Sequence, residues 1–402
     1  MAAPRHATQD TEWLDTAPRR FGVRDARVLL VAVVLAVVIS IVSVLAYQQR
    51  TAATPHPDPP TQPRASVPAR TSTRTPTPQP PSPRSSIIET RTDGAFLEIS
   101  ADYEILGYGP GGVVRIIPAQ GRVIETTAPP VNDVHQLSIV AGRDFVVVRS
   151  ADGSAGYGAQ DGRTVRRLSG MLDRASFVFP GPDPDHVWVT TTPPDKVPGL
   201  TQVTVTLVDR RGIDAGSTLP VPYQGSDYAM VPDDTGYLVG VGTGGYYLAR
   251  PEGLQRITTG SLLAIGPTRF LTHDCDERAR CRLHVIDRTT GARRELPGAG
   301  PGHVWSPGRI SPDGRFAGLV ALRSDGTQRT MVVDLITGTR RQIDDTGPLV
   351  QPQGIVWTPD SRFLLVAGQG RVLRAIDPAT GSVRELSSSI PPLIVIAVRP
   401  RT

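Results

Sequence analysis

Two short motifs recur along the second half of this chain, and their spacing limits the folds it can adopt. Ser311–Phe316 (SPDGRF) returns 47 residues later as Thr358–Phe363 (TPDSRF), and each copy leads into an apolar run. A second pattern, D-x-x-T-G, begins at Asp287, Asp334 and Asp377, at steps of 47 and 43 residues. A repeat of this length indicates an array of similar supersecondary units.

Both motifs have the chemistry of tight turns between strands. Proline at the second position fixes φ at about −65°, and the Asp side chain can accept hydrogen bonds from the N–H groups of the turn. Glycine supplies the positive φ that a hairpin requires. The predicted turn residues are Asp313, Gly314, Asp360, Asp287, Gly291, Asp334, Gly338, Asp377 and Gly381.

The rest of the chain after residue 86 contains weaker copies of the same unit. We place units near 96–128, 135–170, 175–220, 226–259, 261–298, 303–345 and 350–388, each with about four short β-branched runs between Gly, Pro and Asp turns. No stretch in them sustains a 3.6-residue apolar period. The pattern predicts an all-β fold, a β-propeller of about seven four-stranded blades.

One apolar run, Leu393–Val398, lies beyond the seventh unit. We predict that it joins a blade built mainly from the N-terminal end of the domain. Such a strand would hold the ring closed where the two chain ends meet, because each blade of a repeat array packs only on its neighbours.

The paired SPDGR-F and D-x-x-TG-x-x-R elements resemble the repeats of bacterial TolB-type and WD40-like propellers. The resemblance covers most of residues 90–400 and is strongest in the last two or three units. The whole chain has a short basic tail (1–27), one apolar segment (28–47), a Pro/Thr-rich stretch (48–86) and then the repeats, and it is rich in Arg with Lys196 as its one lysine. This layout resembles that of membrane-anchored propeller proteins of the actinobacterial type. The Gly-His and Trp-Asp signature of WD40 repeats is missing, so the resemblance implies a fold and a tendency to bind, without a named partner.

An apolar segment near the N-terminus predicts a single-pass membrane anchor. Val28–Ala46 holds nineteen residues with no charge and no proline, enough for a helix of about 28 Å. We assign 28–47 as the transmembrane helix and 1–27 as a cytoplasmic tail, because arginines that precede an anchor stay inside: Arg19, Arg20, Arg24 and Arg27. A cleaved signal peptide is the alternative, although its apolar core would be shorter.

Residues 48–86 are rich in Pro, Ser and Thr and lack an apolar cluster. Such a segment is predicted to be a disordered linker, either a plain spacer or a carrier of O-linked glycans. The net charge of +5 comes from this N-terminal part: residues 1–86 hold 10 arginines and 5 acidic residues, whereas 87–402 hold 33 basic and 33 acidic residues. A neutral domain offers no electrostatic footprint for nucleic acid.

Cys275 and Cys281 are separated by five residues, between two strand-like runs. A hairpin can bring two such side chains within bonding distance, and an extracytoplasmic compartment is oxidising, so we predict a disulfide. The alternative is a metal site formed with His273, Asp274 and Asp276. No C-x₂-C pair or second His/Cys pair accompanies these residues, which disfavours zinc.

Sequence motifs for catalysis are missing or poorly placed. There is no G-x-S-x-G, H-E-x-x-H or P-loop pattern, and Gly240–Gly245 satisfies G-x-G-x-x-G but leads into a strand instead of a helix. Asp183–His186 is interpreted as a turn, and Trp188, Trp305 and Trp357 as blade-packing residues. The histidines of the domain are scattered: His135, His186, His273, His284 and His303. We therefore predict no catalytic residue, cofactor or metal ligand.

These observations favour a non-enzymatic binding or scaffold module, tethered to the cell membrane through Val28–Ala46 and exposed on the extracytoplasmic side. The expected partner is an envelope protein, peptide or glycan. The alternatives are a propeller-type hydrolase or lyase acting on envelope polymers, or a ligand sensor. Clustered Asp, Glu, Arg and His in one mouth of the channel would favour the enzyme, and a channel lined by Gly, Val and Ser would favour binding.

Overall fold

The computed structural model describes residues 87–91, 102–127, 137–150, 156–160, 164–191, 201–224, 230–278, 280–297, 303–304, 307–322, 327–343, 354–368 and 372–401. All belong to one compact unit, Pro81–Thr402. The predicted cytoplasmic tail, membrane anchor and linker all lie outside the described residues. Among the residues described, no helix has the length and apolar character needed to span a membrane.

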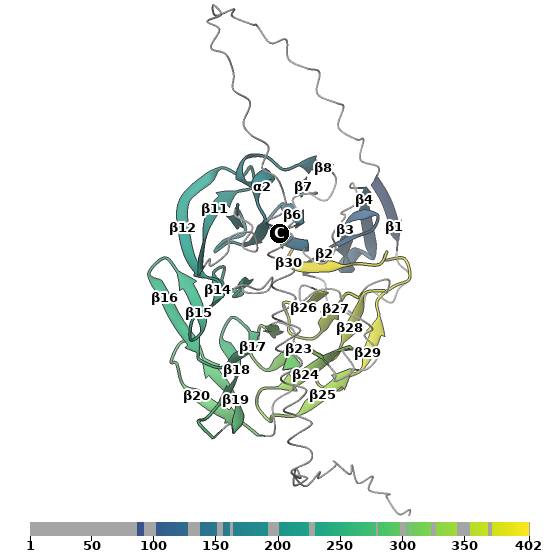
Figure 1. Ribbon diagram of the computed structural model, residues 1–402. Helices are drawn as coiled ribbons and strands as arrows, with labels where there is room; N and C mark the ends of the chain where they lie inside the picture. Colours follow the sequence, from purple (N-terminus) through teal and green to yellow (C-terminus); the bar gives the residue numbers. More distant parts are fainter. Residues whose placement is uncertain are drawn as a thin grey trace, which may run out of the picture. The chain divides into compact units, whose positions relative to one another are not determined.

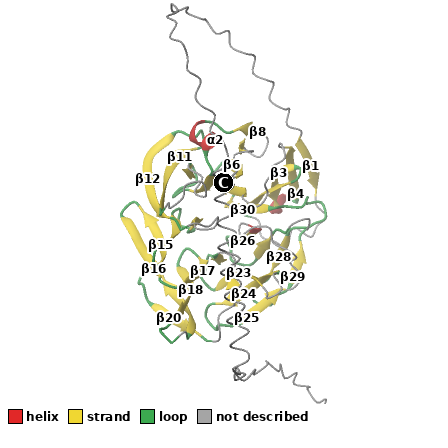
Figure 2. Cartoon of the chain, viewed as in Figure 1, coloured by secondary structure: helices red, strands yellow, loops and turns green. Residues whose placement is uncertain are grey.

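The described chain is almost entirely β-structure (Figure 2). Its two helical segments are short: η2 (Pro118–Gln120) and α2 (Gly170–Arg174). The strands form antiparallel sheets arranged around a common centre, which is a propeller-like arrangement of blades (Figure 1). The all-β prediction is confirmed.

The first sheet joins the two ends of the domain. It has five strands in the spatial order β1-β4-β3-β2-β30. Their bounds are β1 (Ile87–Arg91), β2 (Tyr103–Gly109), β3 (Gly112–Ile117), β4 (Arg122–Thr127) and β30 (Val395–Pro400). The other sheets are each built from strands that are consecutive in the chain.

Three four-stranded sheets follow in order. The second sheet contains β5 (Leu137–Ala141), β6 (Phe145–Ser150), β7 (Gly156–Gln160) and β8 (Thr164–Arg167). The third contains β9 (Phe177–Pro180), β10 (His186–Thr190), β11 (Gln202–Asp209) and β12 (Asp214–Pro222). The fourth contains β13 (Met230–Pro232), β14 (Leu238–Gly242), β15 (Gly245–Arg250) and β16 (Gly253–Thr258).

The next two groups of four strands share one continuous sheet, because their inner strands β17 and β22 pair in parallel. One group is β17 (Ser261–Ile265), β18 (Arg269–Cys275), β19 (Cys281–Asp287) and β20 (Arg293–Leu296). The other is β22 (Gly308–Ile310), β23 (Phe316–Leu322), β24 (Gln328–Asp334) and β25 (Arg340–Ile343), with β21 (His303–Val304) paired to β23. The last sheet is β26 (Ile355–Trp357), β27 (Leu364–Val366), β28 (Arg374–Ile376) and β29 (Val383–Glu385).

Apolar side chains fill the space between each sheet and the next. Strands β2 and β6 are buried on both faces, since every residue in them is buried. Outer strands such as β12 expose most of their residues. A separate apolar cluster lies at each junction between neighbouring groups of strands, including the one between the last sheet and the first. The core is therefore a set of interfaces between blades.

The C-terminal strand completes the first sheet, as predicted. β30 pairs antiparallel with β2 from Tyr103↔Pro400 to Tyr108↔Val395. It begins two residues later than the apolar run suggested, because Leu393 packs against β2 before pairing starts. A Cβ at Gly109 would clash with the backbone carbonyl oxygen of Pro392, so the close approach of the two chain ends depends on glycine there.

The repeated turns have the expected geometry. In the D-x-x-T-G turns, the carboxylates of Asp287, Asp334 and Asp377 accept hydrogen bonds from the following backbone N–H groups at 2.8–3.3 Å. The glycine of each turn has φ between 71° and 77°. Gly314 of the S-P-D-G copy has φ 75°, and Ser361, its counterpart in the other copy, keeps the same left-handed conformation at φ 62°.

Candidate functional site

The innermost strands converge on a central channel with a cavity of about 400 Å³. Six of them line it: β5, β9, β13, β22, β26 and β30. Inner strands contact one another in the order β17, β22, β26, β30, β5, β9 and β13, so β30 lies between β26 and β5. The described wall is mostly apolar, with residues such as Ile139, Phe179, Val356 and Val398, and its two charged residues are Asp234 and Arg309.

Asp234 and Arg309 form an ion pair at the channel wall. Nη1 of Arg309 donates to Oδ1 of Asp234 at 3.0 Å and to the carbonyl oxygen of Pro232 at 2.7 Å. The side chains are 32% and 18% exposed, so both can be reached from the cavity. Desolvation inside the channel raises the pKa of the Asp234 carboxyl, although the positive charge of Arg309 acts to lower it. Asp234 has φ 62°, a left-handed conformation that Asp tolerates better than most residues.

A buried ion pair holds the turn that presents Asp234. Asp233 is fully buried, accepts hydrogen bonds from the N–H groups of Thr235 and Tyr237, and pairs with Nη2 of Arg288 at 2.5 Å. Burial disfavours its ionised form, but the bonds from Thr235 and Arg288 outweigh this and lower the pKa of Asp233. The neighbouring blade, through Arg288, therefore fixes the turn.

Two buried tryptophans hold the backbone beside the ion pair. Trp188 donates from Nε1 to the carbonyl oxygen of Gly236 at 2.7 Å, and Trp357 donates to that of Arg309 at 2.8 Å. Both indoles pack in clusters between blades. They are structural groups of the channel wall, while Trp305 lies outside the described residues.

A second hollow, of about 390 Å³, adjoins the channel at Asp234. The wall of this second hollow also includes Asp183 and His186. The Nδ1 atom of His186 lies 2.8 Å from the carboxylate of Asp183. Asp183 also accepts the N–H of Asp185, and Asp185 pairs with Arg143. Asp183–His186 is thus the turn between β9 and β10 that the sequence indicated, although it borders a cavity.

The other candidate residues that the structure describes are not among those lining the channel cavity. Gly240–Gly245 spans β14 and the turn into β15, so no helix follows it. His273 and His284 lie in β18 and β19, His303 lies in β21, and His135 is outside the described residues. Sequence analysis missed Asp234 and Arg309, which are 75 positions apart and belong to no motif.

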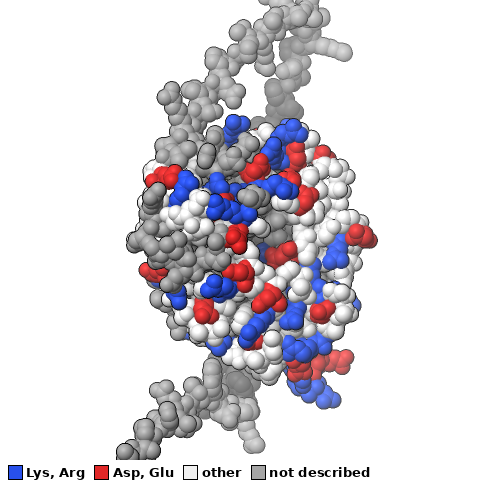
Figure 3. Space-filling view, turned by 180° about the vertical axis from the view of Figure 1, so that it is seen from behind, with Lys and Arg blue, Asp and Glu red and all other residues white. Residues whose placement is uncertain are grey.

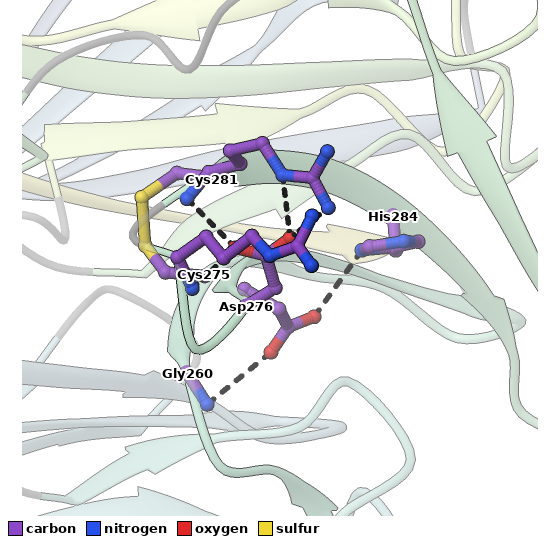
Figure 4. Close-up of a disulfide and its surroundings, with 8 residues drawn as sticks. Gly260, Cys275, Asp276, Cys281 and His284 are labelled. Atoms are coloured by element: carbon purple, nitrogen blue, oxygen red, sulfur yellow. Dashed lines mark hydrogen bonds and ion pairs between the residues drawn. A yellow bond between two sulfur atoms is a disulfide. The ribbon is translucent and has the colours of Figure 1, made fainter.

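The predicted disulfide is present between Cys275 and Cys281, which face each other across the β18–β19 hairpin (Figure 4). The intervening loop is held by Asp276, which accepts the N–H groups of Arg278 and Arg280 at 2.9 Å. Within the described part of the chain, the metal-type cluster here is His273, Cys275 and Cys281. Both of its sulfur atoms belong to the disulfide, so no thiolate is offered to a metal.

Comparison with solved structures finds similar chains at low identity. TolB from Acinetobacter baumannii is 13% identical, with a TM-score of 0.38, covering 74% of this chain and 82% of TolB. The periplasmic gluconolactonase PpgL from Pseudomonas aeruginosa is 18% identical, with a TM-score of 0.40 and coverage of 75% and 99%. A protein of unknown function from Desulfotomaculum acetoxidans DSM 771 has 13% identity and a TM-score of 0.44, with coverage of 75% and 100%.

No protein-family model and no curated protein matches the sequence. The likenesses to solved structures carry no argument about function at these scores. The propeller-like fold of this chain rests on its own strand pairing and on the apolar clusters between its sheets.

Proposed function

We propose that this chain is a membrane-tethered, extracytoplasmic β-propeller of seven blades that binds a peptide segment of an envelope protein in its central channel, without chemical change. The observation that carries the proposal is the channel wall, which is apolar on six inner strands and has one ion pair, Asp234–Arg309. Ligand sites are commonly concave and apolar with a few convergent polar groups.

The channel suits a peptide better than a glycan. An apolar side chain can occupy the wall around Val356 and Val398, while a charged peptide group exchanges with one partner of the ion pair. Trp357, the tryptophan of the described wall, is buried and its indole N–H already donates to Arg309, so this N–H is not free to bond a sugar hydroxyl.

The apolar clusters support the proposed count of seven blades. The described residues form seven such clusters, the number that a closed ring of seven blades would need, and one of them joins β27 and β28 to β2 and β3. The disulfide supports an oxidising, extracytoplasmic compartment. On the face drawn in Figure 3, basic and acidic side chains are interspersed, in agreement with the neutral charge of residues 87–402.

Peptides released from an envelope extract and captured on the full-length protein in detergent can test the proposal. A captured peptide, resynthesised with a fluorophore, should bind at least about tenfold more weakly to Asp234→Asn or Arg309→Gln than to the unchanged protein, because each change breaks a charged contact. Arg256→Gln, an exposed arginine on β16, is the matched control. Unchanged affinity in both channel variants would contradict the assignment.

The proposed orientation has a separate test. A cysteine introduced at Pro60 should react with a membrane-impermeant maleimide on intact cells, and one introduced at Asp10 should react only after permeabilisation. Labelling of Asp10→Cys alone would reverse the orientation.

A propeller-type hydrolase or lyase is the second candidate, favoured by one observation. A carboxyl whose pKa is raised by burial, beside an arginine in a cavity, has the properties of a general acid or base, and Asp234 is such a group. Turnover of an envelope polymer that Asp234→Asn abolishes, while peptide binding persists, would replace the binding function with an enzymatic one.

A further inference from the structure

A separate cleft of about 290 Å³ lies at the junction of the first and second sheets. Its described wall is dominated by arginine and contains two acidic residues, Glu104 and Asp144. The five arginines are Arg115, Arg122, Arg143, Arg399 and Arg401. This concentration is unusual in a domain whose basic and acidic residues are equal in number.

Ring closure brings the five arginines together from distant parts of the chain. Arg115 and Arg122 belong to β3 and β4, and Arg143 precedes β6. Arg399 and Arg401 come from β30 and the residue after it, whose N–H is held by the carbonyl oxygen of Asp102 at 2.8 Å. The cleft therefore exists only when β30 is paired with β2.

The inner wall of this cleft has fewer negative than positive charges. Glu104, which is 3% exposed, pairs with Nη2 of Arg115 at 2.5 Å and with Nη2 of Arg399 at 3.0 Å. Burial opposes ionisation of Glu104, but the bonds from the two guanidinium groups lower its pKa, so the carboxylate is ionised. One carboxylate thus faces two guanidinium groups in a largely desolvated position.

The rim adds further positive charge. Arg401 is exposed and lines the cleft, and no acidic partner of its guanidinium occurs among the described residues. The second acid of the wall, Asp144, is paired with Arg210, which lies outside the cleft. The rim residues Arg122 and Arg143 make exposed pairs with Glu89 and Asp185, and exposed pairs of this kind exchange readily for another anion.

We infer that this cleft binds a phosphoryl group, either as inorganic phosphate or as part of a small phosphorylated molecule. A dianion with three acceptor oxygens matches several guanidinium forks and neutralises the excess charge of the wall. The volume lies at the lower end of the range for small-molecule sites, which suits a ligand of sugar-phosphate size. The inference does not depend on the function of the central channel.

Binding should also stabilise the closed ring. The ligand would bridge Arg115 and Arg122 of the first sheet to Arg399 and Arg401 of the C-terminal strand, and a ligand that binds only the folded state raises the melting temperature. Channel variants such as Asp234→Asn should leave this effect unchanged.

Calorimetric titration and thermal melting of the full-length protein test the inference, with inorganic phosphate, pyrophosphate and glucose 6-phosphate as probes. We expect saturable binding of at least one probe and a melting temperature that rises with its concentration. Arg401→Gln should weaken the binding about tenfold, because it removes one charge-assisted contact. The exposed Arg401 side chain makes no contact that folding requires, and Arg256→Gln is the matched control.

Tighter binding of glucose 6-phosphate than of inorganic phosphate would identify a phosphorylated small molecule as the ligand, and the reverse order would identify phosphate itself. The inference is overturned if none of the three probes binds at millimolar concentration. It is overturned equally if sodium chloride at matched ionic strength raises the melting temperature as much, or if Arg401→Gln and Arg256→Gln bind alike.

Discussion

Deletion of residues 390–402 should prevent stable folding of the propeller. The deleted segment contains β30, whose pairing with β2 joins the two ends of the domain. Leu393, Ile394, Val395 and Ile396 are all buried, and they contribute to two interfaces at once, between the last sheet and the first and between the first and the second. Both faces of this run are therefore covered.

The size of the effect follows from burial. Each fully buried aliphatic side chain contributes about 1.5–3 kcal/mol, so the four together contribute about 6–12 kcal/mol. Typical domains have a total stability of about 5–15 kcal/mol. The deletion would also leave Glu104 without one of its two arginine partners, and removing one member of a buried pair costs about 3–5 kcal/mol. The loss thus approaches the whole stability of a domain.

Thermal melting followed by near- and far-ultraviolet circular dichroism is the assay. The truncated protein should show no cooperative transition, whereas deletion of the predicted linker residues 51–86 should leave the melting temperature unchanged. A milder test compares two single substitutions. Leu393→Ala should lower the free energy of unfolding by about 2–5 kcal/mol. Ile336 is 59% exposed, so Ile336→Ala should lower it by less than about 0.5 kcal/mol. If the truncated protein melts cooperatively at the same temperature, β30 is not what closes the ring.

Three further predictions concern turns, titration and the disulfide. Gly291→Ala should destabilise the folded protein by about 1–2 kcal/mol through its positive φ alone. Gly338→Ala should destabilise it by more, because the new Cβ would also lie 2.8 Å from Pro297 Cδ. Equal midpoints of chemical denaturation for the two variants would contradict this. The pKa of Glu104 is lower in the folded state than in the unfolded state, so the ionised carboxylate stabilises the fold above the unfolded pKa. This stabilisation is lost on acidification below about pH 4. The acid-unfolding curve of Glu104→Gln should therefore lack the part of the pH dependence that comes from Glu104. The Cys275–Cys281 disulfide closes a small loop, so its reduction should lower the free energy of unfolding by about 2 kcal/mol or less. A greater loss in a denaturant titration would mean that the disulfide stabilises more of the protein than the hairpin that contains it.

The sequence predicts the fold well because the turns place strict demands on residue type. These turns need a side chain that accepts backbone hydrogen bonds and, after it, a residue with positive φ. Asp and Gly therefore recur at a fixed spacing within each turn, as at Asp334 and Gly338. The distance from one such turn to the next gives the length of the repeat. The fifth unit, expected at 261–298, contains β17–β20 between Ser261 and Leu296. The first unit, expected at 96–128, omits β1. This strand comes from residues before the expected start and pairs with β4 at the outer edge of the first sheet.

The sites could not be predicted in the same way. Asp234 and Arg309 stand on different blades, and Glu104 and Arg399 are 295 positions apart. Contacts of this kind are made by ring closure, which brings together residues that no local pattern relates. The arginines of the cleft come from β3, β4, β30 and two flanking loops, so the cluster becomes visible only when β30 is placed beside β2.

The C-terminal strand connects the two sites. Residues Ile396, Ala397 and Val398 of β30 line the central channel, while Arg399 and Arg401 line the arginine cleft. A change that loosens this strand, such as Leu393→Ala, should therefore weaken binding at both sites together. Asp234→Asn and Arg401→Gln touch one site each, so the first should impair only peptide binding and the second only phosphate binding. That pattern would separate the chemistry of each site from the strand that both depend on.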